Sequence, residues 1–92
     1  MIIQSKIKDS KKYKQYIDQV SPIVEKYGGR YHVRGENIRS LGDWKPERVI
    51  VIEFQNENQI LKWLASPEYA EVAPLREEGA NAQAIIVEGY QK

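Results

Sequence analysis

A pair of glycines, Gly28-Gly29, restricts the fold most, because of the segments that stand on either side of it. An amphipathic helical pattern leads into the pair, and glycine readily takes the left-handed conformation that ends a helix. Residues 30–35 follow at once with the character of a strand, and residues 48–54 form a second, more apolar strand. A helix followed directly by two short strands favours an α+β domain.

The helical pattern before the glycines begins near Asp9 and Ser10, which are both good N-cap residues. Its apolar residues recur at spacings of three and four as far as Tyr27, so one face of the helix is predicted to be buried. Pro22 lies inside this pattern and lacks a backbone N–H group, so we expect a kink or a break near residues 20–21.

A second helical region follows residues 48–54. Asn56 and Gln59 resemble a capping box at its start, and Ser66-Pro67 restarts a helix with a cap and a proline in the first turn. Pro74 lies further on and permits only a bend or another short turn there. This region is therefore predicted to contain two consecutive helical segments.

The predicted strands complete a β-α-β-β-α-β order. They are residues 2–7, 30–35, 48–54 and 83–89. This order places both helical regions on one face of a four-stranded antiparallel sheet, which is the ferredoxin-like arrangement. We predict a single domain of this kind over residues 1–92.

The third predicted strand is apolar on both of its faces. Ile50, Ile52 and Phe54 point one way, and Val49 and Val51 point the other way. Continuous apolar character indicates burial on both sides, whereas the helices cover only one side. A second copy of the same sheet is the simplest cover, since most soluble oligomers are symmetric. We therefore expect a homodimer whose sheets face each other.

The composition excludes several classes of protein. The chain carries 14 Lys and Arg against 13 Asp and Glu, a net charge of +1, which argues against nucleic-acid binding through bulk charge. It has no cysteine, which rules out disulfides, thiolate metal sites and cysteine nucleophiles. Its longest apolar run, residues 49–52, is too short to cross a membrane, and no signal peptide is recognisable. We therefore expect a cytoplasmic protein that binds neither nucleic acid nor a membrane.

Several short motifs together resemble one protein family. They are Tyr27-Gly28-Gly29-Arg30-Tyr31, Val33-Arg34-Gly35, Gly42-Asp43-Trp44, Pro46-Glu47-Arg48-Val49 and Ser66-Pro67-Glu68-Tyr69. The combination resembles the family called domain of unknown function 1330, which is similar to the dimeric α/β-barrel group. That group includes quinone-forming monooxygenases, lactone isomerases and chlorite dismutase-like haem proteins. The resemblance implies a dimeric barrel but selects no chemistry, because one fold hosts many functions.

His32 and Glu53 are the candidate proton-transfer groups. His32 is the only histidine and stands where the family pattern leads us to expect an aliphatic residue. Strand periodicity places it on one face with Arg30 and Arg34. Glu53 is a carboxylate in an otherwise apolar strand, so either it is paired structurally or its pKa is raised for use as a base. A single histidine cannot form a multi-histidine metal site, and we expect neither a metal nor a cofactor.

Five other residues are candidates for binding a small molecule. Arg34 and Arg48 flank the loop between two strands and could hold an anion, or form a salt bridge with Glu53. Trp44 lies in that loop and could close over a pocket, pin the loop or pack on a partner subunit. Tyr69 is predicted to be near the same cleft, which Arg76 approaches one to two turns later.

Two functions from different classes follow from these residues. The first is a homodimer that binds a small molecule or has a structural role, in which the polar groups stabilise the interface. The second is a cofactor-independent enzyme of the monooxygenase or isomerase kind, acting on a small anionic or enolic substrate between sheet and helices. In it, Arg34 and Arg48 hold an oxygen and Glu53 or His32 moves a proton. The sequence favours the first, because its spacing does not bring an acid and a base together.

Overall fold

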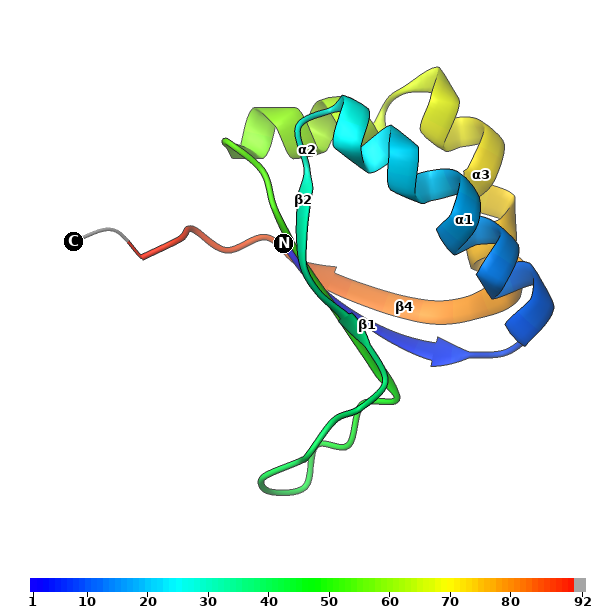
Figure 1. Ribbon diagram of the computed structural model, residues 1–92, viewed down its shortest axis with the longest axis vertical. Helices are drawn as coiled ribbons and strands as arrows, with labels where there is room; N and C mark the ends of the chain where they lie inside the picture. The colour runs from blue at the N-terminus through cyan, green and yellow to red at the C-terminus, as the bar shows by residue number, and fades with distance from the viewer. Residues whose placement is uncertain (91–92) are drawn as a thin grey trace.

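A computed structural model describes residues 1–90; the predicted domain boundary at residue 92 lies outside this range. Its elements are β1 (Ile2–Ile7), α1 (Ser10–Lys26), β2 (Arg30–Gly35), β3 (Arg48–Glu53), α2 (Glu57–Leu64), α3 (Pro67–Gly79) and β4 (Ala80–Ile85) (Figure 1). The four strands form one antiparallel sheet in the order β2-β3-β1-β4. This order confirms the predicted α+β, ferredoxin-like fold, with the second helical region divided into α2 and α3.

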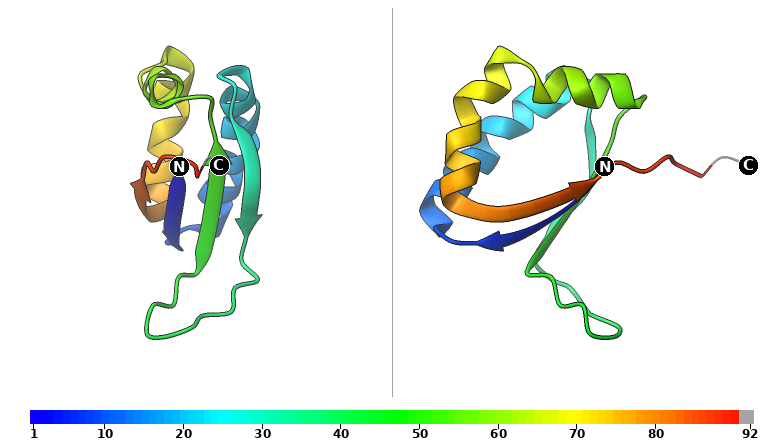
Figure 2. Two further views of the ribbon diagram at one scale, coloured as in Figure 1. Left: turned by 90° about the vertical axis from the view of Figure 1, so that its left-hand side faces the viewer. Right: turned by 180° about the vertical axis from the view of Figure 1, so that it is seen from behind.

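The three helices all lie on one side of the sheet (Figure 2). Side chains alternate along each strand, so the sheet has a covered face toward the helices and an open face away from them. The covered face includes Ile3, Ser5, Ile50, Ile52, Ala82 and Ala84. The open face includes Ile2, Gln4, Val33, Val49, Val51, Glu53 and Ile85.

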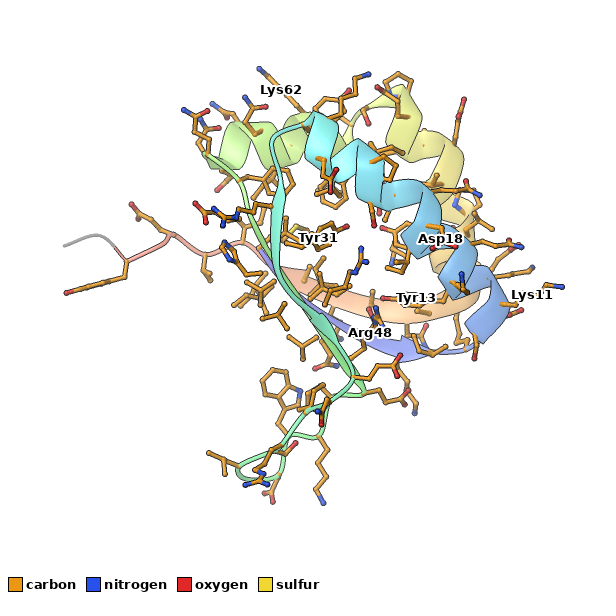
Figure 3. The ribbon with its side chains drawn as sticks, in the orientation of Figure 1. Lys11, Tyr13, Asp18, Tyr31, Arg48 and Lys62 are labelled. Atoms are coloured by element: carbon orange, nitrogen blue, oxygen red, sulfur yellow. The ribbon has the colours of Figure 1, made fainter. Side chains whose placement is uncertain are left out.

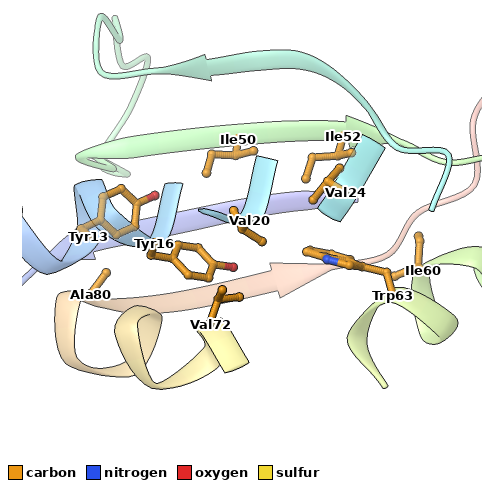
Figure 4. Packing of buried hydrophobic residues seen from close by; sticks show 10 residues of the cluster. All are labelled: Tyr13, Tyr16, Val20, Val24, Ile50, Ile52, Ile60, Trp63, Val72 and Ala80. Carbon is orange, nitrogen blue, oxygen red and sulfur yellow. The ribbon is translucent and has the colours of Figure 1, made fainter. Parts of the chain in front are cut away.

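The hydrophobic core lies between the covered face and the helices (Figure 4). Its buried members are Tyr13, Tyr16, Val20, Val24, Ile50, Ile52, Ile60, Trp63, Val72 and Ala80. The four from α1 are spaced at three or four residues, as the amphipathic pattern predicted. Apolar burial of this kind is the main favourable term that holds the helices on the sheet.

The helix starts follow the predicted caps. The Asp9 carboxylate accepts hydrogen bonds from the backbone N–H groups of Lys11 and Lys12, each at 3.1 Å. The side chain of Asn56 accepts from the backbone N–H of Gln59 at 3.0 Å, and Ser66 caps α3 in the same way. These side chains satisfy donors that a helix start leaves without an intrahelical partner.

Of the predicted kink or break in the first helix, the break is wrong, because α1 continues without interruption through Pro22. Proline removes one backbone donor, but the hydroxyl of Ser21 donates to the carbonyl of Ile17 at 2.7 Å and supports the adjacent turn. Val20 and Val24 are both buried on either side of the proline. Their packing on the sheet holds the helix together where the local propensity is weakest.

The glycine pair ends α1 as predicted. Gly28 has a φ of +87°, in the left-handed region that favours glycine. Gly29 lies so close to the core that a Cβ atom there would approach the Cζ atom of Phe54 to 2.8 Å and clash with Val24. The second glycine is therefore required by packing, and the first by the backbone turn.

The last strand was predicted too late in the chain. It was placed at residues 83–89, whereas β4 runs from Ala80 to Ile85. The run Ile85-Ile86-Val87 has the higher intrinsic strand propensity, but pairing with β1 decides the position. That pairing begins at Ile7 opposite Ala80 and ends at Ile2 opposite Ile85, so residues 86–90 extend beyond the sheet (Figure 1).

Candidate functional site

A cavity of about 320 Å³ lies between the covered face of the sheet and the helices. All seven helices and strands contribute to its wall, which is mainly apolar and aromatic. Known ligand pockets have volumes of roughly 300 Å³ upward and are lined in this way, with a few polar groups that orient the ligand. The cavity is therefore the right size for a small organic molecule.

Two tyrosine hydroxyls meet in the cavity wall. The Oη atoms of Tyr16 and Tyr69 are 3.2 Å apart, and either can be the donor. One shared hydrogen leaves the second hydroxyl hydrogen free for another acceptor. The ring of Tyr69 also meets the ring of Trp63 edge to face, with centroids 5.1 Å apart. The pair is thus fixed in place by aromatic packing and keeps one donor available.

Burial keeps the hydroxyl of Tyr16 protonated. It raises the pKa of Tyr16 far above its ordinary value; the adjacent Tyr69 adds to the rise, and the positive charge of Arg76 partly opposes it. Burial also raises the pKa of Tyr31, against opposing hydrogen bonds and charge from Ser21 and Arg34. A tyrosine whose pKa is raised cannot act as a base near neutral pH, so these hydroxyls serve as hydrogen-bond donors.

Trp63 carries a buried polar atom without a partner. Its side chain is only 2% exposed, and its Nε1 atom has no hydrogen-bond partner among the described residues. The Tyr13 hydroxyl is in the same situation within residues 1–90. Leaving a buried donor unsatisfied costs about 1–3 kcal/mol. An indole N–H can only donate, so a ligand acceptor that reached this atom would remove the cost.

Arg76 is the one positively charged side chain in the cavity wall, which also includes Met1, whose N-terminal ammonium donates to the carbonyl of Ile52. In the part of the chain that the structure describes, its guanidinium makes no side-chain hydrogen bond and no ion pair. No carboxylate and no imidazole from residues 1–90 lines the cavity. The described cavity wall therefore offers hydrogen-bond donors and positive charge, but no acidic or imidazole side chain.

The seven residues that the sequence singled out are divided among three places. Tyr69 and Arg76 line the cavity. Arg34 and Arg48 lie on the covered side near α1 without lining it, and Figure 3 shows Arg48 with Tyr13 and Tyr31 between the strands and that helix. Glu53, His32 and Trp44 belong to the open side, away from the cavity. The structure does not bring the proposed proton-transfer groups to the proposed arginines.

Arg34 points to the covered side because of a β-bulge in β2. The expectation that it shares a face with Arg30 and His32 is wrong, since the pairing register shifts by one residue around His32. A bulge inserts one unpaired residue and reverses the faces that follow it. Arg34 then lies opposite Ile50, and its Nη1 atom donates to the Ser21 hydroxyl at 2.8 Å.

Arg48 is held at the other end of α1. Its Nη1 atom donates to the Oε1 atom of Glu36 at 2.8 Å, and its guanidinium lies 5.3 Å from the ring centroid of Tyr13. Its side chain is 13% exposed, and its Nε atom has no partner among the described groups. Arg48 thus connects the loop after β2 to the start of α1, and its acidic partner is Glu36 rather than Glu53.

His32 and Glu53 pair with each other on the open side. The Nε2 atom of His32 lies 2.7 Å from the Oε1 atom of Glu53, and both side chains are largely exposed, at 43% and 66%. Trp44 also reaches the open face, where its Nε1 atom donates to the side-chain oxygen of Gln4 at 2.6 Å. The loop tryptophan therefore lies on the sheet and not over the cavity.

The sequence did not single out Trp63, Tyr16 and Tyr13 as site residues. Their helical spacing was the reason, because aromatic residues at that spacing are usually core, and these residues are indeed buried. Their polar atoms distinguish them from ordinary core residues, and only the three-dimensional packing shows that the indole N–H has no partner. Spacing alone carries no signal of this kind.

Two further structural findings concern the described residues 1–90. No group of three or more His, Cys, Asp and Glu side chains there could hold a metal ion. No helix within the same range is both long enough and apolar enough to cross a bilayer.

A family model matches residues 1–90, almost the whole chain. Its description is a domain of unknown function, DUF1330. The chain belongs to the DUF1330 family. The predicted resemblance is confirmed by this match, which assigns no activity. No curated protein sequence matches the chain.

Two solved structures share the fold of this DUF1330 protein. One is the crystal structure of RPA0582 from Rhodopseudomonas palustris, a structural genomics target of unknown function; it is 15% identical with a TM-score of 0.82, covering 99% of this chain and 81% of that one. The other is methylated RPA0582, 14% identical with a TM-score of 0.69, covering 97% and 81%. At this identity, the likeness concerns the fold alone.

Proposed function

We propose that this DUF1330 protein is a homodimer that binds a small organic molecule in the cavity between its sheet and its helices. The observation that carries the proposal is the cavity of about 320 Å³ with the buried, unpartnered Trp63 indole in its wall. A core that needed only to be filled would not retain both an open space and an unsatisfied donor. A bound ligand would remove both costs.

Binding is favoured over catalysis by the position of the proton-transfer candidates. Glu53 and His32 belong to the open side of the sheet and pair with each other there. The monooxygenase-like or isomerase-like alternative requires one of them within hydrogen-bond reach of a substrate held in the cavity. The groups that do line the cavity are hydrogen-bond donors, which hold a ligand without abstracting its proton. We propose that this binding protein acts in the cytoplasm, with which its cysteine-free sequence is compatible.

The dimer is supported by the apolar residues of the open face. Ile85 is 57% exposed and Val33 is 45% exposed, and Ile2, Val49 and Val51 lie between them with partial exposure. A wider groove continues this surface between the ends of β1 and β3 and the extended residues 86–90. Contiguous exposed apolar surface of this kind marks an interaction site. A second copy of the same face offers the matching apolar surface.

The dimer is tested by placing a charge at the centre of the open face. Val51→Asp should raise the dimer dissociation constant by about 100-fold or more, because an unpaired carboxylate would have to leave water. Lys62→Asp on α2 is the control, since that side chain is exposed on the helical side of the molecule and should leave the dissociation constant unchanged (Figure 3). Sedimentation velocity over a range of concentrations measures both. A monomeric wild-type protein at micromolar concentration would contradict the dimer.

The binding function is tested by filling the cavity. Ala82 lies in its wall on β4, whereas the adjacent Asn81 side chain points to the open face. Ala82→Leu should abolish the binding of small ring compounds detected by ligand-observed NMR, and Asn81→Leu should leave it unchanged. Equal binding to wild type and Ala82→Leu would contradict the location of the site. Absence of any binder from a diverse fragment collection would contradict the function itself.

A further inference from the structure

Several polar groups of the cavity wall have a hydrogen to donate, whereas Ser5 and Gln83 can donate or accept. The Trp63 indole N–H is free among the described residues, and the Tyr16–Tyr69 pair retains one unused hydroxyl hydrogen. Arg76 adds a planar guanidinium with donors only. No described acidic side chain lines the wall to balance this cation. A ligand that satisfies these groups must bring acceptor oxygens and, in so apolar a site, a negative charge.

The walls of the cavity favour a flat ligand. Tyr16, Tyr69 and Trp63 surround one part of it through edge-to-face contacts, with ring centroids 6.4 Å and 5.1 Å apart. Figure 4 shows the Tyr16 hydroxyl and the Trp63 indole facing the same interior space from α1 and α2. Ile50 and Ile52 close the opposite side from β3. Aromatic rings pack best against another ring in offset or edge-on geometry.

From these observations we infer that the cavity takes a small aromatic carboxylate. The carboxylate pairs with the Arg76 guanidinium and accepts from the Trp63 indole or the tyrosine hydroxyls, while the ring lies among the aromatic side chains. A carboxylic acid of ordinary pKa is ionised at neutral pH, which matches the positive charge of the wall. This inference rests on the proposed small-molecule binding and adds the chemical class of the ligand to it.

Benzoate and benzamide are the matched probes, since they share a ring and differ in charge. Isothermal titration calorimetry of the full protein should give a dissociation constant at least tenfold lower for benzoate than for benzamide. Acetate, which has the charge without the ring, should bind at least tenfold more weakly than benzoate. The Trp44→Phe variant leaves Trp63 as the one tryptophan. Benzoate should therefore change the tryptophan fluorescence excited selectively in this variant, which locates the ligand in the cavity.

Arg76→Met should weaken benzoate binding at least tenfold and leave benzamide binding unchanged, while Arg76→Lys should restore part of the affinity. Arg39→Met removes an exposed arginine of the loop and is the control with the same net charge; it should change neither affinity. If benzamide binds as tightly as benzoate, or Arg76→Met has no effect, the ligand class is overturned while small-molecule binding stands. If no probe and no other fragment binds, both the ligand class and the proposed binding function are contradicted.

Discussion

Neighbouring residues of one strand differ in burial according to the face of the sheet on which they lie. On β3, Ile50 and Ile52 are almost completely buried under the helices, whereas Val49 and Val51 between them face the open side and are only partly buried. The strand propensity is similar for all four, and the helices account for the difference. The covered face is packed under the helices of its own chain, whereas the open face has apolar side chains that are partly exposed.

The polar groups of the two faces differ in whether they have hydrogen-bonding partners. On the open side they find partners across the surface, as His32 does with Glu53 and Trp44 does with Gln4. On the covered side, the Trp63 indole has no partner in the described chain and Arg76 forms no ion pair there. Surface pairs of the first kind contribute little energy. Unsatisfied groups in a cavity are the better indication of a ligand, and the site is therefore placed on the covered side.

The largest predicted effect is a difference in stability loss between substitutions on the two faces of β3. Ile52→Ala should lower the free energy of unfolding by about 3 kcal/mol, because it leaves a space in the packed core. Val51→Ala, one residue earlier, should cost less than about 1 kcal/mol in the monomer, because its side chain is not enclosed there. Urea unfolding at several protein concentrations measures both and separates the dimer contribution. Equal losses at all concentrations would show that the faces are energetically alike.

A second test concerns the close approach of α3 to α1 on the covered side. A Cβ atom on Gly79 would lie 2.7 Å from the backbone nitrogen of Tyr13, and the Gly79 carbonyl accepts from the N–H groups of Lys8 and Asp9. Gly79→Ala should therefore cost about 2 kcal/mol through displaced backbone. Gly35→Ala is the control, because a Cβ atom there would meet nothing within 4 Å. Equal changes in the thermal unfolding temperature for Gly79→Ala and Gly35→Ala would contradict the close contact.

A smaller effect is expected from the buried tyrosine at alkaline pH. Tyr16 has a raised pKa in the folded protein, whereas in the unfolded chain it ionises near pH 10. Above that pH the unfolded state loses a proton that the folded state keeps, so stability falls as the pH rises, by up to about 1.4 kcal/mol per pH unit. Tyr16→Phe should make this alkaline decline shallower, and below pH 9 it should leave the slope of stability against pH unchanged.

Tyr90→Phe is the matched control, because the Tyr90 side chain is 89% exposed. The decline of wild type and of this variant should be the same when unfolding by urea is followed from pH 8 to 11. A wild-type slope that Tyr16→Phe does not change would mean that the Tyr16 hydroxyl ionises as readily in the folded protein as in water.

The elements of the fold could be predicted from local sequence signals. Asp9, Asn56 and Ser66 mark helix starts through chemistry that acts within three residues, and Gly28 marks a helix end through its backbone freedom. Where tertiary contacts competed with local preference, the prediction failed. Pairing with β1 moved β4 away from the more strand-prone Ile86-Val87, and packing carried α1 through Pro22.

The site was less predictable because it depends on faces and on missing partners. A single bulge residue, His32, turns Arg34 to the covered side, and periodicity alone cannot reveal such an insertion. Tyr69 and Arg76 were singled out and line the cavity, whereas Trp63 was assigned to the core on its spacing. Whether an indole N–H has an acceptor depends on residues distant in the sequence, so only the assembled fold shows it.

The smallest expected effect tests whether the contact between His32 and Glu53 on the open side contributes to the stability of the protomer. Glu53→Gln removes the charge opposite His32 and keeps the shape of the side chain. Because both groups are well exposed, the free energy of unfolding should change by less than about 0.5 kcal/mol at pH 6 and pH 8. His32→Gln should give the same result, measured by urea unfolding of the monomer at low concentration. A loss above about 2 kcal/mol in either variant would mean that the open side is as tightly organised as the covered one, and the contrast between the faces would fail.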